Sequence, residues 1–299
     1  MTKLTQLIDS ASRQQKKYTV SVAAADDCLI LDTVVKAIEL DLCSFLLYGN
    51  EEYIRNYFNE CNFTINDNVK IRNATNNDRA IDLAVQSIVK READLLMKGN
   101  VDTAAILKVA LNKENGLKNG SLLSHVALFD VPSLGKSILL TDAALSITPS
   151  LKDKIEIINN SVAVAHKIGI KEPKVALLSA IEKVNPAIEA TMDAAVLTQM
   201  NRRGQIVGCI VDGPLALDNA VSSSSVEQKH IESPVAGDAD ILIVPNIEVG
   251  NALYKSLVYF ANASLGSVVV GAKIPIILTS RADSSENKLN SIALALNVV

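Results

Sequence analysis

The stretch LKDKIEIINNSVAVAHKIGIKEPKVALLSA, residues 151–180, contains the two kinds of segment that decide the fold. In residues 151–169 the apolar side chains recur at the spacing of one helix face, and Gly169 offers a stop at the C-terminal end. Residues 174–180 form a short, continuous apolar run, which is typical of a strand buried on both faces. The stretch therefore predicts a helix followed by a buried strand.

The same alternation extends along the chain. Apolar, β-branched runs that predict strands lie at residues 19–25, 44–49, 94–99, 137–144, 174–180, 206–214, 240–246, 267–272 and 274–280. Helical patterns such as RAIDLAVQSIVKREA separate them. Continuous apolar strands that alternate with helices indicate a mostly parallel sheet covered on both faces, so the predicted fold class is α/β.

The composition narrows the class of protein. Of the 299 residues, 48% are hydrophobic and 21% are charged, so the chain can bury a sizeable core. The net charge of −4 leaves no basic excess, which argues against a nucleic-acid partner. No run approaches the roughly 20 apolar residues of a membrane span, and the first residues are too polar for a secretory signal.

The cysteines and histidines give no sign of a metal site or of disulfides. The cysteines are scattered without a CxxC pair, and the three histidines also stand apart from one another. Isolated thiols in a chain of this length indicate reduced cysteines in a cytoplasmic protein. A zinc site requires clustered ligands, so no metal is expected. These residues are Cys28, Cys43, Cys61, Cys209, His125, His166 and His230.

Small and polar residues follow nearly every predicted strand, as in KGN, TDAA, DGPLA and SRADS. In open α/β sheets, ligands bind outside the carboxyl ends of the strands, although surface loops are polar for other reasons too. The sequence lacks GxGxxG after the first strand, GxxxxGK[ST] and GxSxG. Without an obvious covalent nucleophile, the pattern favours direct transfer between two bound substrates.

A long polar connection is predicted before the strand at 240–246. It begins with SSSS at residues 222–225 and continues through VEQKHIESPVAGDAD. A segment of this kind is either mobile surface or a lid over a site.

Six motifs together resemble the phosphate butyryltransferase family, which belongs to a larger phosphate acyltransferase group that includes phosphate acetyltransferase. The resemblance extends from about residue 94 to residue 299, and before residue 94 only the alternation of strands and helices matches. The motifs are MKGNVDT (97–103), TDAALS (141–146), ALLSAIE (176–182), DGPLALDNA (212–220), SPVAGDADILIVPNIEVGN (233–251) and GAKIPIILTSRADS (271–284).

The resemblance implies that acyl-CoA and inorganic phosphate are converted reversibly to acyl phosphate and CoA, without a metal or an acyl-enzyme. Coenzyme A is then a substrate, and no cofactor is expected. The resemblance also implies two three-layer α/β/α domains that face a cleft. Residues 128–270 would form the second domain, inserted into a first domain of residues 1–127 and 271–299. A homodimer or a larger homo-oligomer in the cytoplasm is expected, with no membrane partner.

The stretch TSRADS carries the proposed chemistry. Ser280 and Arg281 match the Ser-Arg pair in the active site of the acetyltransferases. A guanidinium can hold the phosphate dianion and offset the charge of a tetrahedral intermediate. The alternative interpretation of Arg281 is an exposed arginine in a surface ion pair. The Ser280 hydroxyl would hydrogen-bond the CoA sulfur or the carbonyl oxygen, and it could also cap the next helix.

A general base is required when the thiol of CoA attacks acyl phosphate. The acetyltransferases have an Asp several residues after the Ser-Arg pair. Here the seventh residue after Ser280 is Asn287, which cannot serve as a base. Asp283 and Glu286 are the nearby carboxylates, and Asp283 is favoured on proximity alone.

Other strand ends supply candidate substrate-binding residues. Lys98 and the amides after it could hold phosphate, although Asn100 could simply cap a helix. The Gly-Pro turn predicted after Asp212 would by itself explain that carboxylate. His125 stands before a predicted domain junction, and Asn246 lies in a predicted cleft wall. The candidates are Lys98, Gly99, Asn100, His125, Thr141, Asp142, Asp212, Asn246 and Glu286.

Three other functions compete with this interpretation. A phosphate acetyltransferase would use the same mechanism with a smaller acyl pocket. A decarboxylating dehydrogenase of related fold would need clustered acidic residues for a metal and a nicotinamide site. A CoA- or phosphate-binding subunit that has lost its base is favoured only by Asn287.

Overall fold

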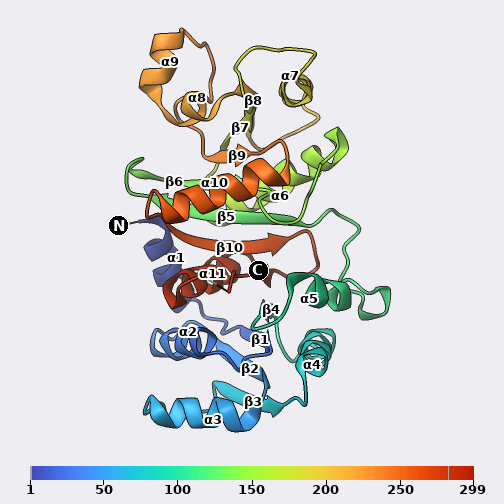
Figure 1. Cartoon of the computed structure of the whole chain (residues 1–299), viewed down its shortest axis with the longest axis vertical. Coiled ribbons are helices and arrows are strands. Elements are labelled where there is room, and N and C mark those ends of the chain that lie inside the picture. The colour runs from blue at the N-terminus through green and yellow to red at the C-terminus, as the bar shows by residue number, and fades with distance from the viewer. Residues whose placement is uncertain (1, 282) are drawn as a thin grey trace. The chain divides into compact units, whose positions relative to one another are not determined.

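The computed structural model describes residues 2–281 and 283–299 (Figure 1). By their internal contacts these residues form two compact units. The first unit comprises residues 3–121 and 266–299, and the second comprises residues 122–265. Each unit is a sheet with helices on both faces, so the α/β fold class is confirmed.

The sheet of the first unit is mostly parallel. In the order β3-β2-β1-β4-β11-β10, every described pairing is parallel except that of β10 with β11. The strands are β1 (Thr19–Ala23), β2 (Ser44–Gly49), β3 (Val69–Asn73), β4 (Leu95–Lys98), β10 (Ser264–Val270) and β11 (Ile276–Ile277). Because β1, β2, β4 and β11 run in one direction, their carboxyl ends lie at one edge of the sheet.

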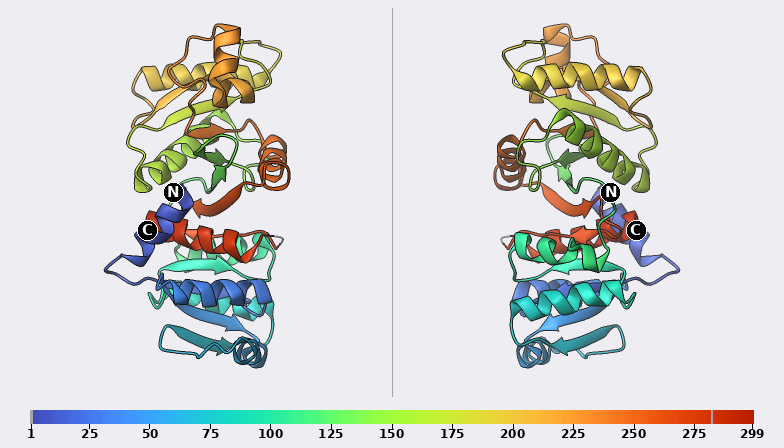
Figure 2. Two further views of the ribbon diagram at one scale, coloured as in Figure 1. Left: turned by 90° about the vertical axis from the view of Figure 1, so that its left-hand side faces the viewer. Right: turned by 90° about the vertical axis from the view of Figure 1, so that its right-hand side faces the viewer.

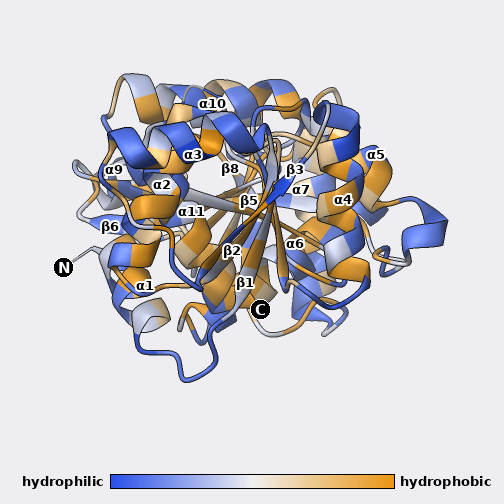
Figure 3. Ribbon diagram, turned by 90° about the horizontal axis from the view of Figure 1, so that it is seen from below, coloured by the Kyte–Doolittle hydropathy of each residue, from blue (hydrophilic) through white to orange (hydrophobic). Residues whose placement is uncertain are grey.

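Two layers of helices cover this sheet, as Figure 3 shows from below. One face carries α1 (Lys3–Ser12), α2 (Cys28–Glu39), α3 (Glu51–Glu60) and α11 (Ser285–Val298). The other carries α4 (Asn77–Val89) and α5 (Thr103–Ala110), and a 3-10 turn, η1, follows at Lys113–Asn115. The helices after the strands start sharply, because Asp27, Asn50 and Asn76 each accept a hydrogen bond from a backbone N–H of the first turn.

The second unit has a mixed sheet in the order β5-β6-β9-β7-β8. Only the hairpin of β5 (Ser124–Val131) and β6 (Lys136–Thr141) is antiparallel; β7 (Lys174–Leu178), β8 (Ile210–Leu215) and β9 (Ile241–Ile243) are parallel to β6. The helices α6 (Leu151–Lys167) and α7 (Glu189–Arg202) lie on one face (Figure 2). On the other lie α8 (Leu217–Val221), α9 (Ser223–Lys229) and α10 (Ile247–Tyr259).

The opening stretch of the sequence folds as predicted. Ser150 and Asp153 form a capping box at the start of α6, and Gly169 follows its end with φ of +92°. A positive φ is costly for residues other than glycine, which explains the stop. In β7, four of the five residues are buried.

Two local predictions need correction, and a third segment proves partly helical. Strands β3 and β5 were missed: β3 is an exposed edge strand with a weak apolar pattern, whereas β5 is a largely buried strand that pairs with β6 in a hairpin. The polar connection begins with the helix α9, which Ser222 caps, and Gly237 N donates to Asn219 O; its interpretation as mobile surface or as a lid stays a prediction. The segment from Asp212 to Pro214 lies inside β8 instead of forming a turn after it.

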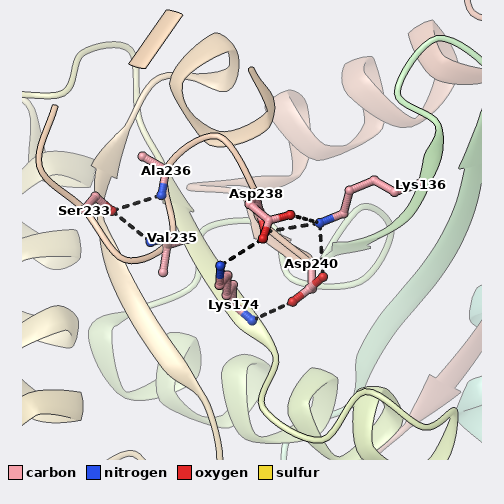
Figure 4. Close-up of polar contacts among 7 residues, drawn as sticks. All are labelled: Lys136, Lys174, Ser233, Val235, Ala236, Asp238 and Asp240. Atoms are coloured by element: carbon pink, nitrogen blue, oxygen red, sulfur yellow. Dashed lines mark hydrogen bonds and ion pairs between the residues drawn. The ribbon is translucent and has the colours of Figure 1, made fainter. Parts of the chain in front are cut away.

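A cluster of charged residues joins the amino ends of three strands of the second unit, and we call Lys136, Lys174, Asp238 and Asp240 the amino-edge clip (Figure 4). Lys136 Nζ and Lys174 Nζ each lie 2.8 Å from a carboxylate oxygen of Asp238. Asp240 accepts from Lys136 Nζ at 3.2 Å and from Lys174 N at 2.9 Å. Asp238 and Asp240 of the motif at 233–251 thus hold neighbouring strands together at the amino edge of the sheet, opposite to its carboxyl edge.

Candidate active site

The carboxyl edge of the first unit has the geometry of an anion site. Beyond the ends of β1, β4 and β11, the helices α2, α5 and α11 begin after Asp27, Asp102 and Ser284. The N-terminus of a helix presents unpaired backbone N–H groups and a partial positive charge. Three such ends near one sheet edge favour a phosphate group there.

Gly99 lets the ends of β4 and β1 pack closely. Gly99 N donates to Ala23 O, and Asn100 N donates to Ala24 O, both at 2.9 Å. A Cβ atom on Gly99 would lie only 2.0 Å from Ala24 O. The glycine is therefore required by contact with backbone. Asn100 is not the helix cap, because Asp102 occupies that position in α5.

Lys98 ends β4 as a buried cation, with only 5% of the residue exposed. Its Nζ donates to Val101 O at 3.2 Å and to Gly99 O at 3.4 Å. Burial lowers the pKa of Lys98, and the positive charges of Arg281 and Lys288 lower it further, while Asp102 and Asp283 oppose that change. Three cations from β4, the loop after β11 and α11 therefore lie near one another.

The loop after β11 brings Ser280 and Asp283 into contact, and we call the described residues Ser280, Arg281 and Asp283 the Ser280–Asp283 turn. Ser280 N donates to Asp283 Oδ2 at 2.7 Å, and Asp283 N donates to Ser280 O at 3.2 Å. Ser280 is exposed, whereas Asp283 is buried. The cap of α11 is Ser284, which accepts from Asn287 N at 3.2 Å. Ser280 therefore does not cap the helix, and that alternative reading is wrong.

Arg281 projects from this turn and pairs with Asp102 across the edge. Its Nη2 lies 2.9 Å from Asp102 Oδ1, and the two side chains are 63% and 82% exposed. An ion pair so exposed contributes little to stability, so a phosphate group could replace the carboxylate at low cost. Arg281 is thus both a surface ion-pair residue and accessible to an anion.

The carboxylates that were considered as general base differ in their surroundings. Asp283 is in contact with Ser280, while Glu286 is exposed in the first turn of α11. Asn287 lies in the same turn, and its carbonyl accepts from Ser291 Oγ at 2.8 Å.

In the second unit, β5 starts beside the end of β6, so His125 and Asp142 come together. Asp142 is buried, and its Oδ2 accepts from His125 N at 3.2 Å. Its Oδ1 accepts from the backbone N–H groups of Ala144 and Leu145, both at 2.9 Å. The carboxylate therefore shapes the loop after β6. The buried ring of His125 lies 6.0 Å from the ring of Tyr254.

Thr141 and Asn246 lie at the same edge of the second unit. Thr141 is fully buried, and its Oγ1 has no hydrogen-bond partner among the described residues. Asn246 caps α10 by accepting from Val249 N at 3.0 Å. In that helix a Cβ on Gly250 would lie 2.7 Å from Asp142 O, so α10 packs directly on the loop after β6.

Asp212 is not brought together with these residues. It pairs in register with Ala176, and β8 is three strands away from β6, or about 14 Å. Its Oδ1 lies 3.9 Å from Arg202 Nη2.

Two residues of the first unit were missed by the sequence analysis. Asp102 lies in the motif MKGNVDT but was not singled out, and its pairing with Arg281 depends on the tertiary fold. Lys288 is 2% exposed and bonds the Ser280–Asp283 turn from the first turns of α11. A cation near a helix N-terminus is unfavourable, and that position is the one signal that could have drawn attention to it.

Two further structural findings concern residues 2–281 and 283–299. No group of three or more His, Cys, Asp or Glu side chains in these ranges is arranged to hold a metal ion. Nor does any helix in them combine the length and apolar character needed to cross a membrane.

Comparison with known proteins identifies the chain's relatives. Residues 76–296 match the family described as phosphate acetyl/butaryl transferase. A probable phosphate butyryltransferase of Bacillus subtilis is 50% identical over 98% of this chain and 97% of its own length. A phosphate butyryltransferase of Clostridium beijerinckii is 46% identical over 92% of this chain and 91% of its own length. A branched-chain phosphotransacylase from Enterococcus faecalis superposes with a TM-score of 0.83 at 38% identity, covering 94% of this chain and 98% of that one.

The fold and these matches define an acyltransferase enzyme of the α/β class. The chain belongs to the phosphate acetyl/butaryl transferase family. The resemblance stated from the sequence motifs is thereby confirmed.

Proposed function

We propose that this enzyme converts butanoyl-CoA, or a similar short or branched acyl-CoA, and inorganic phosphate reversibly to acyl phosphate and CoA. Both substrates are bound together and the acyl group passes directly between them. The names of the relatives support this choice, since one is a phosphate butyryltransferase, one a probable phosphate butyryltransferase and one a branched-chain phosphotransacylase. Coenzyme A is a substrate, and no separate cofactor takes part.

The observation that carries the proposal is the cationic carboxyl edge of the first unit. Arg281, Lys98 and the starts of three helices supply positive charge and N–H donors there. In the proposed reaction, a phosphate oxygen attacks the thioester carbonyl carbon and a tetrahedral intermediate forms. The carbon–sulfur bond then breaks, and its electron pair leaves with sulfur. The donors at this edge stabilise the charge that develops on the reacting oxygens.

Ser280 and Asp283 complete the proposed chemistry. The exposed Ser280 hydroxyl donates to the carbonyl oxygen or to the departing sulfur. In the reverse direction Asp283 takes the proton of the CoA thiol, which then attacks the acyl phosphate as thiolate. We favour Asp283 over Glu286 because its carboxylate contacts Ser280 N, at 2.7 Å, whereas Glu286 is exposed on the helix.

The remaining candidates are proposed to contact substrate without taking part in proton transfer. Gly99 and Asn100 offer the backbone between β4 and α5, and Glu286 lies beside the turn. In the second unit, the buried Thr141 hydroxyl is a donor for a substrate group, and Asp142 holds the loop that follows. The other second-unit candidates are His125, Asn246 and Asp212.

The test is thiol release from acetyl-CoA, butanoyl-CoA and 2-methylpropanoyl-CoA, with and without phosphate and with EDTA. We expect phosphate-dependent release that survives the chelator. Each buried methylene contributes about 0.8 kcal/mol, so butanoyl-CoA should exceed acetyl-CoA by roughly tenfold in kcat/KM. A higher kcat/KM with acetyl-CoA would favour the phosphate acetyltransferase reading. Loss of activity in EDTA with recovery on adding a divalent cation would contradict the metal-free mechanism.

We also propose that the enzyme assembles as a homodimer or a larger homo-oligomer. The helix α10 supports this: Leu253, Leu257 and Val258 pack against the core of the second unit, but large apolar side chains near its two ends stay exposed. Val249, Tyr259 and Phe260, at its two ends, are 41%, 64% and 86% exposed. Light scattering of Phe260→Asp against the unchanged protein tests this.

All four cysteines are free thiols, which supports the expected cytoplasmic setting.

A further inference from the structure

Lys288 occupies a position that is unfavourable for a lysine. It is the fourth residue of α11, where the partial positive charge of the helix end repels a cation. Only 2% of the residue is exposed. Burial lowers the pKa of Lys288, and the carboxylates of Asp283 and Asp27 oppose that change. Burying an ammonium at such a position destabilises the fold unless its contacts compensate.

The two hydrogen bonds of the Lys288 ammonium both go to the turn that carries Arg281. Its Nζ donates to Ser280 O at 2.7 Å and to Asp283 O at 2.9 Å. These two carbonyls are the ends of the turn, which Ser280 and Asp283 also close through their own two hydrogen bonds. The lysine therefore holds both ends of this short turn, and it restricts the direction in which the Arg281 side chain projects from the turn.

We propose that Lys288 is a positioning residue for the transfer reaction: it holds the Ser280–Asp283 turn so that Ser280 and Arg281 meet the reacting groups in fixed geometry. This inference rests on the proposed function of that turn. Lys288 bonds backbone carbonyls, so it acts on the reaction through Ser280 and Arg281. A displacement of about 1 Å at reacting groups can cost on the order of 100-fold in rate, which sets the expected effect.

The test compares Lys288→Met with Lys288→Arg. Methionine fills a similar volume but donates no hydrogen bond, whereas arginine keeps the charge and the donors. We expect Lys288→Met to lower kcat/KM for phosphate by about 100-fold and Lys288→Arg to recover at least tenfold of that loss. The KM for butanoyl-CoA should change by less than threefold. If Lys288→Met keeps the kinetic constants of the unchanged enzyme, the proposal is wrong.

A mutant cycle separates positioning from general loss of stability. If Lys288 acts through Ser280 and Arg281, then adding Lys288→Met to an enzyme that already carries Ser280→Ala and Arg281→Ala should lower kcat/KM by less than about fivefold further. The matched control is Lys136→Met in the amino-edge clip, a lysine that also holds a carbonyl and carboxylates but lies in the other unit. It should lower the urea midpoint with unchanged kinetics. Full additivity in the cycle, or an equal kinetic loss in the control, would show that Lys288 is only structural.

Failure of the proposed function is recognised separately. Before any variant is compared, the unchanged enzyme is assayed with all three acyl-CoA substrates and phosphate. Absence of phosphate-dependent thiol release in that assay refutes the proposed function. If the unchanged enzyme is active and Lys288→Met equals it, only the positioning role is refuted.

Discussion

Replacing Gly99 by alanine should disable the enzyme for a purely steric reason. Gly99 is not among the described glycines with a positive φ, so its backbone conformation is open to alanine without strain. The added Cβ would instead lie 2.0 Å from Ala24 O and 2.6 Å from Ala23 O. Both are backbone atoms at the end of β1, and no change of rotamer can remove the contact.

The expected magnitude follows from these distances. Carbon–oxygen contacts below 3.0 Å are essentially never seen for Cβ atoms, so the ends of β4 and β1 must separate by about 1 Å. The bonds Gly99 N to Ala23 O and Asn100 N to Ala24 O are stretched at the same time. Overpacking costs about 1–3 kcal/mol and each lost bond about 1 kcal/mol, so we expect a loss of about 3–5 kcal/mol.

Urea unfolding and steady-state kinetics measure the two consequences. Because Lys98 and Asn100 move with Gly99, kcat/KM should fall on the order of 100-fold. The control is Gly135→Ala in the β5–β6 hairpin, where φ is +63° and nothing lies within 4 Å of the added Cβ. That variant should lose about 1–2 kcal/mol from backbone strain and keep its kinetics. A Gly99→Ala enzyme with unchanged stability and rate would refute the steric argument.

Three further predictions concern charged residues. Arg281→Lys keeps the charge but loses the planar pair of donors, so turnover should fall about 100-fold in the acyl-transfer assay. Asp283→Asn should slow the attack of CoA on acyl phosphate by about 100-fold, while Glu286→Gln should slow this step at least tenfold less. Asp238→Asn should lower stability near pH 7 without changing the rate, because Lys136 and Lys174 lower the pKa of the Asp238 carboxyl and its charge is lost in the variant.

The pH dependence of the last prediction has a definite sign. A lowered folded-state pKa gives stability that is fully present above the unfolded value of about 3.9 and is lost as the pH falls through the lower folded value. The urea midpoints of the unchanged enzyme and Asp238→Asn should therefore differ at pH 7 and converge as the pH falls below about 4. A constant difference from pH 7 to pH 3 contradicts this account.

Each active-site prediction has an opposite outcome that decides it. If Arg281→Lys turns over like the unchanged enzyme, Arg281 is only a surface ion-pair residue. If Glu286→Gln loses more rate than Asp283→Asn, Glu286 is the general base. Since asparagine can still accept from Ser280 N, a loss of folding in Asp283→Asn would show that the turn requires the charge.

The sequence alone determined the features that depend on neighbours along the chain. Apolar spacing and Gly169 predicted α6, because one helix face and one stop are both local properties. The continuous apolar run at 174–180 likewise predicted β7. The α/β class followed from the repetition of such pairs. The motifs at 97–103 and 271–284 also pointed to the family, because a motif is a short run of neighbouring residues and can be recognised without the fold.

The tertiary structure alone decided which side chains meet. Lys288 bonds Ser280 O only because α11 folds back beside the end of β11, and Arg281 meets Asp102 only because β11 pairs with β4. The sequence separation of Arg281 and Asp102 is 179 residues, which no local pattern can bridge. Asp212 illustrates the reverse error, since its Gly-Pro neighbours predicted a turn but pairing of β8 with β7 keeps it within a strand. The order of the strands depends on how all the helices and strands together bury their apolar faces. Contacts between side chains at the ends of different strands therefore form only when the sheet is assembled.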